Sequence, residues 1–251
     1  MKTPIITALA AAGMMAAFAD TSTNTSSTGV VTPEKLNPWD SSVSAGLSLT
    51  RGNSDSTLFT IKLLTERKGL TDEFLFGADV SYGSSNSQEN NQTTHGFGQW
   101  NHLFSERTYG DIRVEGLHDG IANIKYRVTL TAGLGYYFIK EKNTTLAGEV
   151  GLGEVFERLG NKNDNFTAVR FAERFEHKFS EHSARIWQSV ELLPQVDKWS
   201  NYLMNFEVGV EAAVAKNVSL QACLDDNYAS QPAAGRKRND VKLVSGIAYK
   251  F

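Results

Sequence analysis

The chain has 251 residues, a formal net charge of −3 at pH 7 and a single cysteine, Cys223. This charge balance gives no strongly basic face for nucleic acid, and one cysteine excludes an internal disulfide and a zinc site built from several cysteines. The length suits one large β domain or two small ones.

The first residues have the pattern of an export signal. Lys2 is followed by an apolar run, Ile5–Phe18, and residues 17–19 form a small-x-small cleavage pattern. A membrane anchor is the alternative, but this run of about 14 residues is shorter than the ~20 that a helix needs to cross a bilayer. We therefore expect residues 1–19 to be a cleaved signal peptide.

The next segment, 20–39, is rich in Thr, Ser and Asn and shows no periodicity, so we expect a flexible N-terminal segment. From Trp39 onward the dominant period is two. In 126–138 the even positions are apolar or aromatic and the odd positions are small or polar, as in a β-strand with one dry and one wet face. The domain should therefore span 40–251.

The same alternation predicts about twelve strands along this domain. We place them at 40–50, 56–67, 73–86, 92–104, 107–119, 125–140, 143–158, 165–179, 183–193, 200–215, 217–230 and 239–251. Their lengths exceed the ~5–6 residues usual in soluble sheets and meet the ~9–11 that a tilted strand needs to span a membrane.

The connections alternate in character along the chain. One set is tight, at 68–72, 105–106, 141–142, 180–182 and 216, and the other is longer and more polar, at 51–55, 87–91, 120–124, 159–164, 194–199 and 231–238. This asymmetry is typical of an outer-membrane barrel, and an even number of strands places both termini at the short-turn, periplasmic rim.

The fold class that follows is all-β, a transmembrane antiparallel up-and-down β-barrel. In lipid every backbone amide needs an internal partner, so strands can span only as a closed ring. Glycines such as Gly77, Gly135 and Gly209 fall on the polar face, where they would relieve crowding inside the ring. Aromatic residues near strand ends would form the interfacial girdles.

The polar face carries charges of both signs. An Arg or Lys facing lipid at the midplane would cost ~2–4 kcal/mol, so we expect these side chains in the interior. They are Asp79, Asp111, Arg113, Glu115, Arg127, Glu149, Arg170, Arg174, Glu207, Glu211 and Lys242.

Two arrangements of these interior charges remain open. They either pair into a network that plugs the ring or line a water-filled pore and set its selectivity. A ring of this size has a backbone radius of about 12 Å, which admits small solutes and also lets long side chains meet across the middle.

Two predicted strands depart from the pattern. In 165–179 Glu173 shares an otherwise apolar face with Phe171 and Phe175. A β-bulge, a protein–protein contact or a different register would each account for it.

In 183–193 neither face is cleanly apolar. Glu191 shares one face with Trp187 and Leu193, and Gln188 shares the other with Val190. The orientation of this strand therefore stays open.

Several short motifs resemble one family. They are Gly46–Asp55, Tyr126-Arg127-Val128 followed by Ala132–Tyr136, Glu149-x-Gly151-x-Gly153, Phe175–Ser180 and Arg236–Asp240. Through 40–251 the chain resembles the YdiY-like family of salt-induced outer membrane proteins, a domain of unknown function. The resemblance implies an outer-membrane barrel and brings no known substrate or mechanism. The family name suggests a link to salt that no residue here shows.

The C-terminal motif Gly246-x-x-Tyr249-x-Phe251 resembles the signal by which the barrel-assembly machinery recognises its clients. Val244 departs from it, because a polar residue is usual there. The partners expected are outer-membrane lipid, the assembly machinery and periplasmic chaperones during biogenesis, and small solutes or ions. The location expected is the outer membrane of a Gram-negative bacterium.

No catalytic constellation is recognisable. The five histidines show no close metal-ligand spacing, and no His-x-Ser pair occurs. We predict no enzyme activity, cofactor or metal. Two alternatives remain: an outer-membrane hydrolase that uses loop-end residues such as His118 and Asp225, and a soluble periplasmic β-barrel that binds a ligand among apolar residues inside.

Overall fold

The computed structural model describes residues 39–50, 56–86, 88–179 and 183–251. The predicted signal peptide (1–19), the predicted N-terminal segment apart from Trp39, and the predicted connections at 51–55 and 180–182 lie outside the described residues. Among the described residues no helix is long and apolar enough to cross a membrane.

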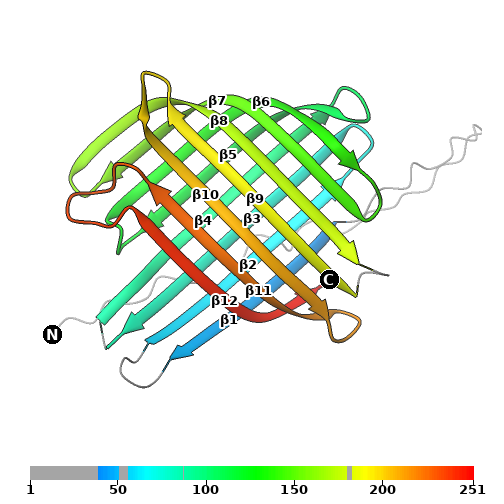
Figure 1. The fold of residues 1–251 in the computed structure, drawn as a ribbon, viewed down its shortest axis with the longest axis horizontal. Coiled ribbons are helices and arrows are strands. Elements are labelled where there is room, and N and C mark those ends of the chain that lie inside the picture. Colours follow the sequence, from blue (N-terminus) through cyan, green and yellow to red (C-terminus); the bar gives the residue numbers. More distant parts are fainter. Residues whose placement is uncertain (1–38, 51–55, 87, 180–182) are drawn as a thin grey trace, which may run out of the picture. The chain divides into compact units, whose positions relative to one another are not determined.

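The described residues form twelve antiparallel strands that close into one barrel, each hydrogen-bonded to its sequence neighbours (Figure 1). The strands are β1 (Asp40–Thr50), β2 (Ser56–Lys68), β3 (Asp72–Ser85), β4 (Gln88–Leu103), β5 (Thr108–Asp119), β6 (Ile124–Lys140), β7 (Thr144–Leu159), β8 (Lys162–Phe179), β9 (Ala184–Gln195), β10 (Lys198–Ala213), β11 (Val218–Ala229) and β12 (Asn239–Lys250).

The predicted fold class is confirmed, because β1 pairs with β12 and closes the ring. The register of this closing pair runs from Ser42 opposite Lys250 to Gly46 opposite Gly246. We call the rim that holds the start of β1 and the end of β12 the proximal rim, and the opposite one the distal rim.

The outer surface is apolar. In β6, Val128, Leu130 and Leu134 are 40%, 47% and 58% exposed, whereas the intervening Thr129 and Thr131 are buried. The same alternation continues in β12, where Leu243 and Ile247 are exposed and Lys242 is buried. Apolar side chains therefore face outward, and the alternative of a soluble barrel with an apolar interior is wrong.

The predicted contrast between tight turns and longer loops is wrong at most positions. The distal connections are short between β3 and β4, at Gly160–Asn161 and at Val196–Asp197, and the connection at 230–238 is long. Polar residues expected in loops continue the ladders instead, as when Arg158 pairs with Asn163. Asn86 (φ 50°) and Gly160 (φ 60°) adopt the left-handed conformation that such tight turns need.

The two ambiguous strands are resolved by their registers. Pairing of β8 with β9 runs without a shift from Phe171 opposite Leu192 to Phe179 opposite Ala184, so no bulge turns Glu173 inward. In β9 the face with Trp187, Glu191 and Leu193 is the inner one, and Leu193 is 3% exposed.

Aromatic rings lie on glycines inside the barrel. Trp187 of β9 is directly opposite Gly209 of β10, and Tyr109 of β5 is opposite Gly135 of β6. A Cβ added at either glycine would overlap the facing ring. Each glycine therefore makes room for one large side chain in the crowded interior.

We predict that Gly209→Ala destabilises the barrel by about 1–3 kcal/mol, because the added methyl group must displace the Trp187 ring from a packed site. Urea unfolding of the refolded protein, followed by tryptophan fluorescence, measures this. The matched control is Gly116→Ala in β5, where an added Cβ meets nothing within 4 Å. Equal midpoints for the two variants would contradict the packing role.

Candidate functional site

The barrel interior gathers charged side chains into ion pairs, several of which join strands that are not neighbours in the sheet. Its centre is Arg170 of β8, which is 3% exposed. The guanidinium lies 2.7 Å from Glu149 of β7, 2.6 Å from Glu191 of β9 and 3.6 Å from Asp111 of β5. We call these four residues the central cluster. An arginine with several donors in a fixed plane suits such convergence of carboxylates.

Arg113 extends the central cluster across the interior. Its guanidinium binds Glu115 at 2.8 Å on its own strand and approaches Glu191 at 3.9 Å. Arg113 is on β5 and Glu191 on β9, and these strands are not adjacent. His95 of β4 continues the chain of contacts, with Nδ1 2.8 Å from Asp79 and Nε2 3.3 Å from Glu115.

A second crossing is made by Lys62 of β2. Its Nζ is 3.3 Å from Glu207 of β10 and 3.1 Å from Asp225 of β11. Trp187 Nε1 also donates to Glu207, at 2.5 Å. Because β2 is not adjacent to β10 or β11 in the ring, this lysine bridges the interior rather than one ladder. We call Lys62, Glu207 and Asp225 the lysine bridge.

Two residues of the lysine bridge, together with Cys223, form a group of described residues that could hold a metal ion. One ligand atom each of Glu207, Cys223 and Asp225 lies within 4.8 Å of the others. Lys62 Nζ contacts all three side chains, with Cys223 Sγ at 3.8 Å. The ammonium therefore lies among the groups that a metal ion would need as ligands.

Further pairs lie toward both rims. Near the distal rim Arg127 binds Glu157 at 2.7 Å, and Lys242 Nζ of β12 reaches Thr93 of β4 at 3.0 Å. Near the proximal rim Glu211 accepts from Arg185 at 2.7 Å and pairs with Lys250 at 2.6 Å. The interior is thus crossed by side chains at more than one place.

The third crossing joins β3 and β6. Tyr137 donates a hydrogen bond to Glu73, and Lys140 Nζ lies 3.4 Å from the same carboxylate. Next to it is a cavity of about 80 Å³ whose lining includes Tyr109, Tyr137 and Arg174. Among the described residues Arg174 forms no ion pair with a carboxylate within 4.0 Å. Its guanidinium therefore gives the wall of this cavity a positive charge.

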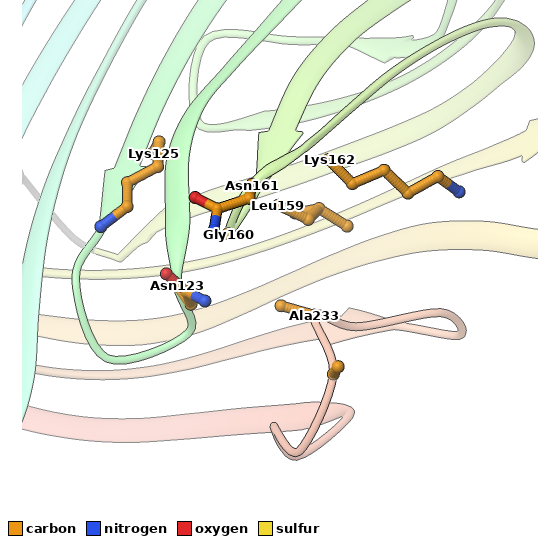
Figure 2. A pocket seen from close by; sticks show the side chains of 8 residues that line it. Asn123, Lys125, Leu159, Gly160, Asn161, Lys162 and Ala233 are labelled. Atoms are coloured by element: carbon orange, nitrogen blue, oxygen red, sulfur yellow. The ribbon is translucent and has the colours of Figure 1, made fainter.

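A larger cavity, of about 600 Å³, opens at the distal rim. It lies between the β5–β6, β7–β8 and β11–β12 connections and is lined by Asn123, Lys125, Leu159, Gly160, Asn161, Lys162, Ala233 and Ala234. Figure 2 shows that the side chains of Lys125 and Lys162 extend in different directions. The lining therefore offers no converging pair of cations.

The interior is not polar throughout. Five buried side chains form an apolar cluster on the inner wall of β7–β10: Val155, Phe166, Ala168, Leu193 and Leu203. The inner wall therefore carries an apolar patch as well as ion pairs.

The predicted interior charges all lie on the strand face opposite the exposed apolar residues. The structure brings Asp111, Glu149 and Arg170 into the central cluster and places Arg113, Glu115 and Asp79 beside it. Glu207 joins the lysine bridge, Glu211, Arg127 and Lys242 lie nearer the rims, and Arg174 borders the small cavity.

The residues of the predicted assembly signal lie on β12 and just after it. Gly246 faces Gly46 where the barrel closes. Tyr249 and Phe251 are 48% and 63% exposed, and their rings stack with centroids 6.3 Å apart.

Several partners in this network were missed by sequence reasoning. They are Lys62, Glu73, His95, Glu157, Arg185 and Glu191. Alternation could have revealed Lys62, which stands between the outward Ile61 and Leu63. Glu191 was hidden because its strand has polar residues on both faces.

His118 and Asp225, the residues named for the alternative hydrolase, lie on opposite faces of the barrel wall. His118 of β5 is on the outer face, and its Nδ1 is 2.9 Å from the carbonyl oxygen of Lys125. Asp225 of β11 points inward, where Lys62 binds it. The two residues therefore do not meet.

Comparison with known proteins agrees with the fold. Residues 43–251 match the family described as protein of unknown function, DUF481. This confirms the resemblance noted from the motifs. No curated protein matches the chain.

Two solved structures share the architecture. The NanC porin is 7% identical, with a TM-score of 0.52 over 84% of this chain and 100% of that one. An outer membrane channel from Pseudomonas putida F1 is 11% identical, with a TM-score of 0.50 over 86% and 96% of the two chains. At such identity the likeness shows the fold alone.

We predict that Arg170→Leu lowers the free energy of unfolding by about 3–5 kcal/mol, because it leaves the buried Glu149 and Glu191 without their cation. Urea titration of the refolded protein measures this. The control Arg158→Leu, at an exposed distal position of β7, should stay within about 0.5 kcal/mol of wild type. A loss no larger than that of the control would show that the central cluster contributes little to stability.

Proposed function

Because this chain belongs to the DUF481 family, whose description leaves the activity open, we propose a function from the geometry of the interior. The protein works in the outer membrane as a narrow passive channel for small ions or solutes. In the described conformation the channel is closed by side chains that meet across the lumen.

The observation that carries this proposal is the lysine bridge. Lys62 reaches from β2 across the barrel interior to Glu207 on β10 and Asp225 on β11. The side chains of Lys62 and Glu207 are 25% and 37% exposed, so water reaches both members of the pair. A solvated ion pair contributes little net stability and can open and re-form.

The chemistry of the interior favours a channel over an inert barrel. Replacing buried ion pairs by well-packed apolar residues is often neutral or stabilising, so charges are a poor choice where stability alone is needed. Charged rings and polar walls are what narrow pores use to admit and select ions. The shared fold of a porin and an outer membrane channel supports the same reading.

Opening of the lysine bridge would change the charge of the constriction. When Lys62 swings away, Glu207 and Asp225 leave two carboxylates facing the lumen. The open constriction would then attract cations and repel anions. Selectivity at this point of the lumen would thus be set by β10 and β11.

A structural envelope protein with a permanently plugged interior is the second candidate. The central cluster favours it, since Arg170 is 3% exposed and holds three carboxylates from three strands. Such a barrel would span the membrane without conducting.

Export and assembly complete the proposal. The N-terminal export signal would direct the chain to the periplasm, where chaperones and the barrel-assembly machinery would receive it. The exposed Tyr249 and Phe251 beside the closing strand pair are placed where an assembly factor could bind them.

We predict that Lys62→Ala raises single-channel conductance in planar bilayers and shifts the reversal potential in a KCl gradient toward cation preference. The reason is that the substitution removes the crossing side chain and leaves Glu207 and Asp225 unneutralised. Adding Glu207→Gln to Lys62→Ala should reverse part of the shift toward cation preference, because it removes one of the two carboxylates.

The control is Lys216→Ala, which removes an exposed lysine from the proximal turn between β10 and β11 and should leave conductance unchanged. Silent bilayers for wild type and Lys62→Ala alike, with protein shown to be folded by heat-modifiable migration, would remove the channel and leave the structural barrel.

A further inference from the structure

Polar pairs interrupt the apolar outer surface at more than one place, and one of them, Glu173 with Gln188, lies well away from the strand ends; another, Glu154 with Thr167, lies nearer the distal rim. Glu173 of β8 alternates with the exposed Phe171 and Phe179, so its side chain faces outward. Gln188 of β9 likewise lies on the outer face, between Ile186 and Val190. Gln188 Nε2 donates to Glu173 Oε2 at 2.9 Å, so these two outward-facing polar residues meet across the β8–β9 ladder.

This pair lies deep in the membrane-facing surface. Glu173 lies six residues before Phe179, the last residue of β8. At ~3.4 Å per residue and a tilt of ~40°, that places it about 15 Å from the proximal end, near the middle of an apolar band ~25 Å tall. The surroundings offer no water for the pair.

The pair does not satisfy itself. One hydrogen bond joins the two side chains, which leaves Glu173 Oε1, Gln188 Oε1 and the second amide proton of Gln188 without a partner among the described residues. On the β7 side Glu173 faces Gly148, and the side chain that lies over this glycine is the apolar ring of Phe138, which offers no hydrogen bond. Unpaired polar groups in hydrocarbon are strongly unfavourable, so a partner outside the barrel is expected.

We propose that this surface of β8 and β9 binds a second copy of the chain in the membrane. The pair contains both a donor and acceptors, so a two-fold axis beside it brings each free amide proton to the other copy's carboxyl group. A self-complementary patch of this kind is what a two-fold interface requires. The surrounding Ile186, Val190 and Val208 are short, branched side chains that allow close approach of two sheets.

The inference needs the barrel to lie in a bilayer but does not need it to conduct. A silent channel leaves it intact, and a monomeric protein leaves the channel intact. The two proposals can therefore fail separately.

Disulfide cross-linking in lipid vesicles tests the dimer. Val190 lies directly opposite Glu173 on the outer face, so Val190→Cys should give a disulfide-linked dimer under mild oxidation. Val80→Cys, at an exposed apolar position of β3 on a distant part of the ring, is the matched control and should stay monomeric. The native Cys223 is buried in the interior, and protein without an added cysteine gives the baseline.

Adding Glu173→Val and Gln188→Leu to Val190→Cys should reduce the linked dimer to the level of the Val80→Cys control. These replacements are typical of the lipid-facing surface, so folding should be kept, which heat-modifiable migration checks. Glu173→Gln, which retains hydrogen bonding, should keep the dimer. Equal cross-linking at Val190→Cys and Val80→Cys, no cross-linking at Val190→Cys, or a dimer unaffected by removing the pair would each overturn the proposal.

Discussion

Backbone hydrogen bonding in a medium without water is the constraint on which the rest of this structure depends. An open sheet would leave two unpaired edges in hydrocarbon, and only the pairing of β1 with β12 removes them. Closure then divides every strand into an outer and an inner face. The outer face is largely apolar, as in β6 and β12, and most charged residues of the spanning segments point inward.

Turning the charges inward creates a second problem, because an interior this narrow cannot hydrate them all. The structure solves it by pairing. Arg170 collects three carboxylates, and Arg113 and Lys62 reach strands that are not their neighbours. Glycines opposite Trp187 and Tyr109 make room for the rings among these pairs. The same ion pairs therefore cross the interior, from β2 to β10 and β11 and from β5 to β9.

Polar residues on the outer surface also pair with each other. Glu173 and Gln188 both depart from the apolar pattern of the outer face. The sequence does not show that they are partners, and they meet because β8 and β9 are adjacent. Such a pair satisfies part of its hydrogen-bonding capacity within one barrel. The remainder sets this side of the barrel apart from the surface of β3 or β6, where exposed residues such as Val80 and Leu130 are apolar.

The sequence by itself determined the fold class, the strand number and the orientation of most strands, because alternation with period two records directly which face meets lipid. Long strands and a closed ring followed from the same physics. The prediction from sequence failed where polarity did not distinguish the two faces of a strand, as in β9, whose inner face carries both Trp187 and Glu191. It also failed at the distal connections, where polar residues such as Asn163 belong to the strand ladder and not to a loop.

The tertiary structure alone decided which charges pair. Lys62 and Glu207 are 145 positions apart in the chain, and no periodicity links them. Their contact depends on the curvature of the ring, on the strand register, and on whether the side chains are long enough to reach across the interior. Those quantities arise only when the barrel closes, which is why a list of inward charges could be read from the sequence and their partners could not.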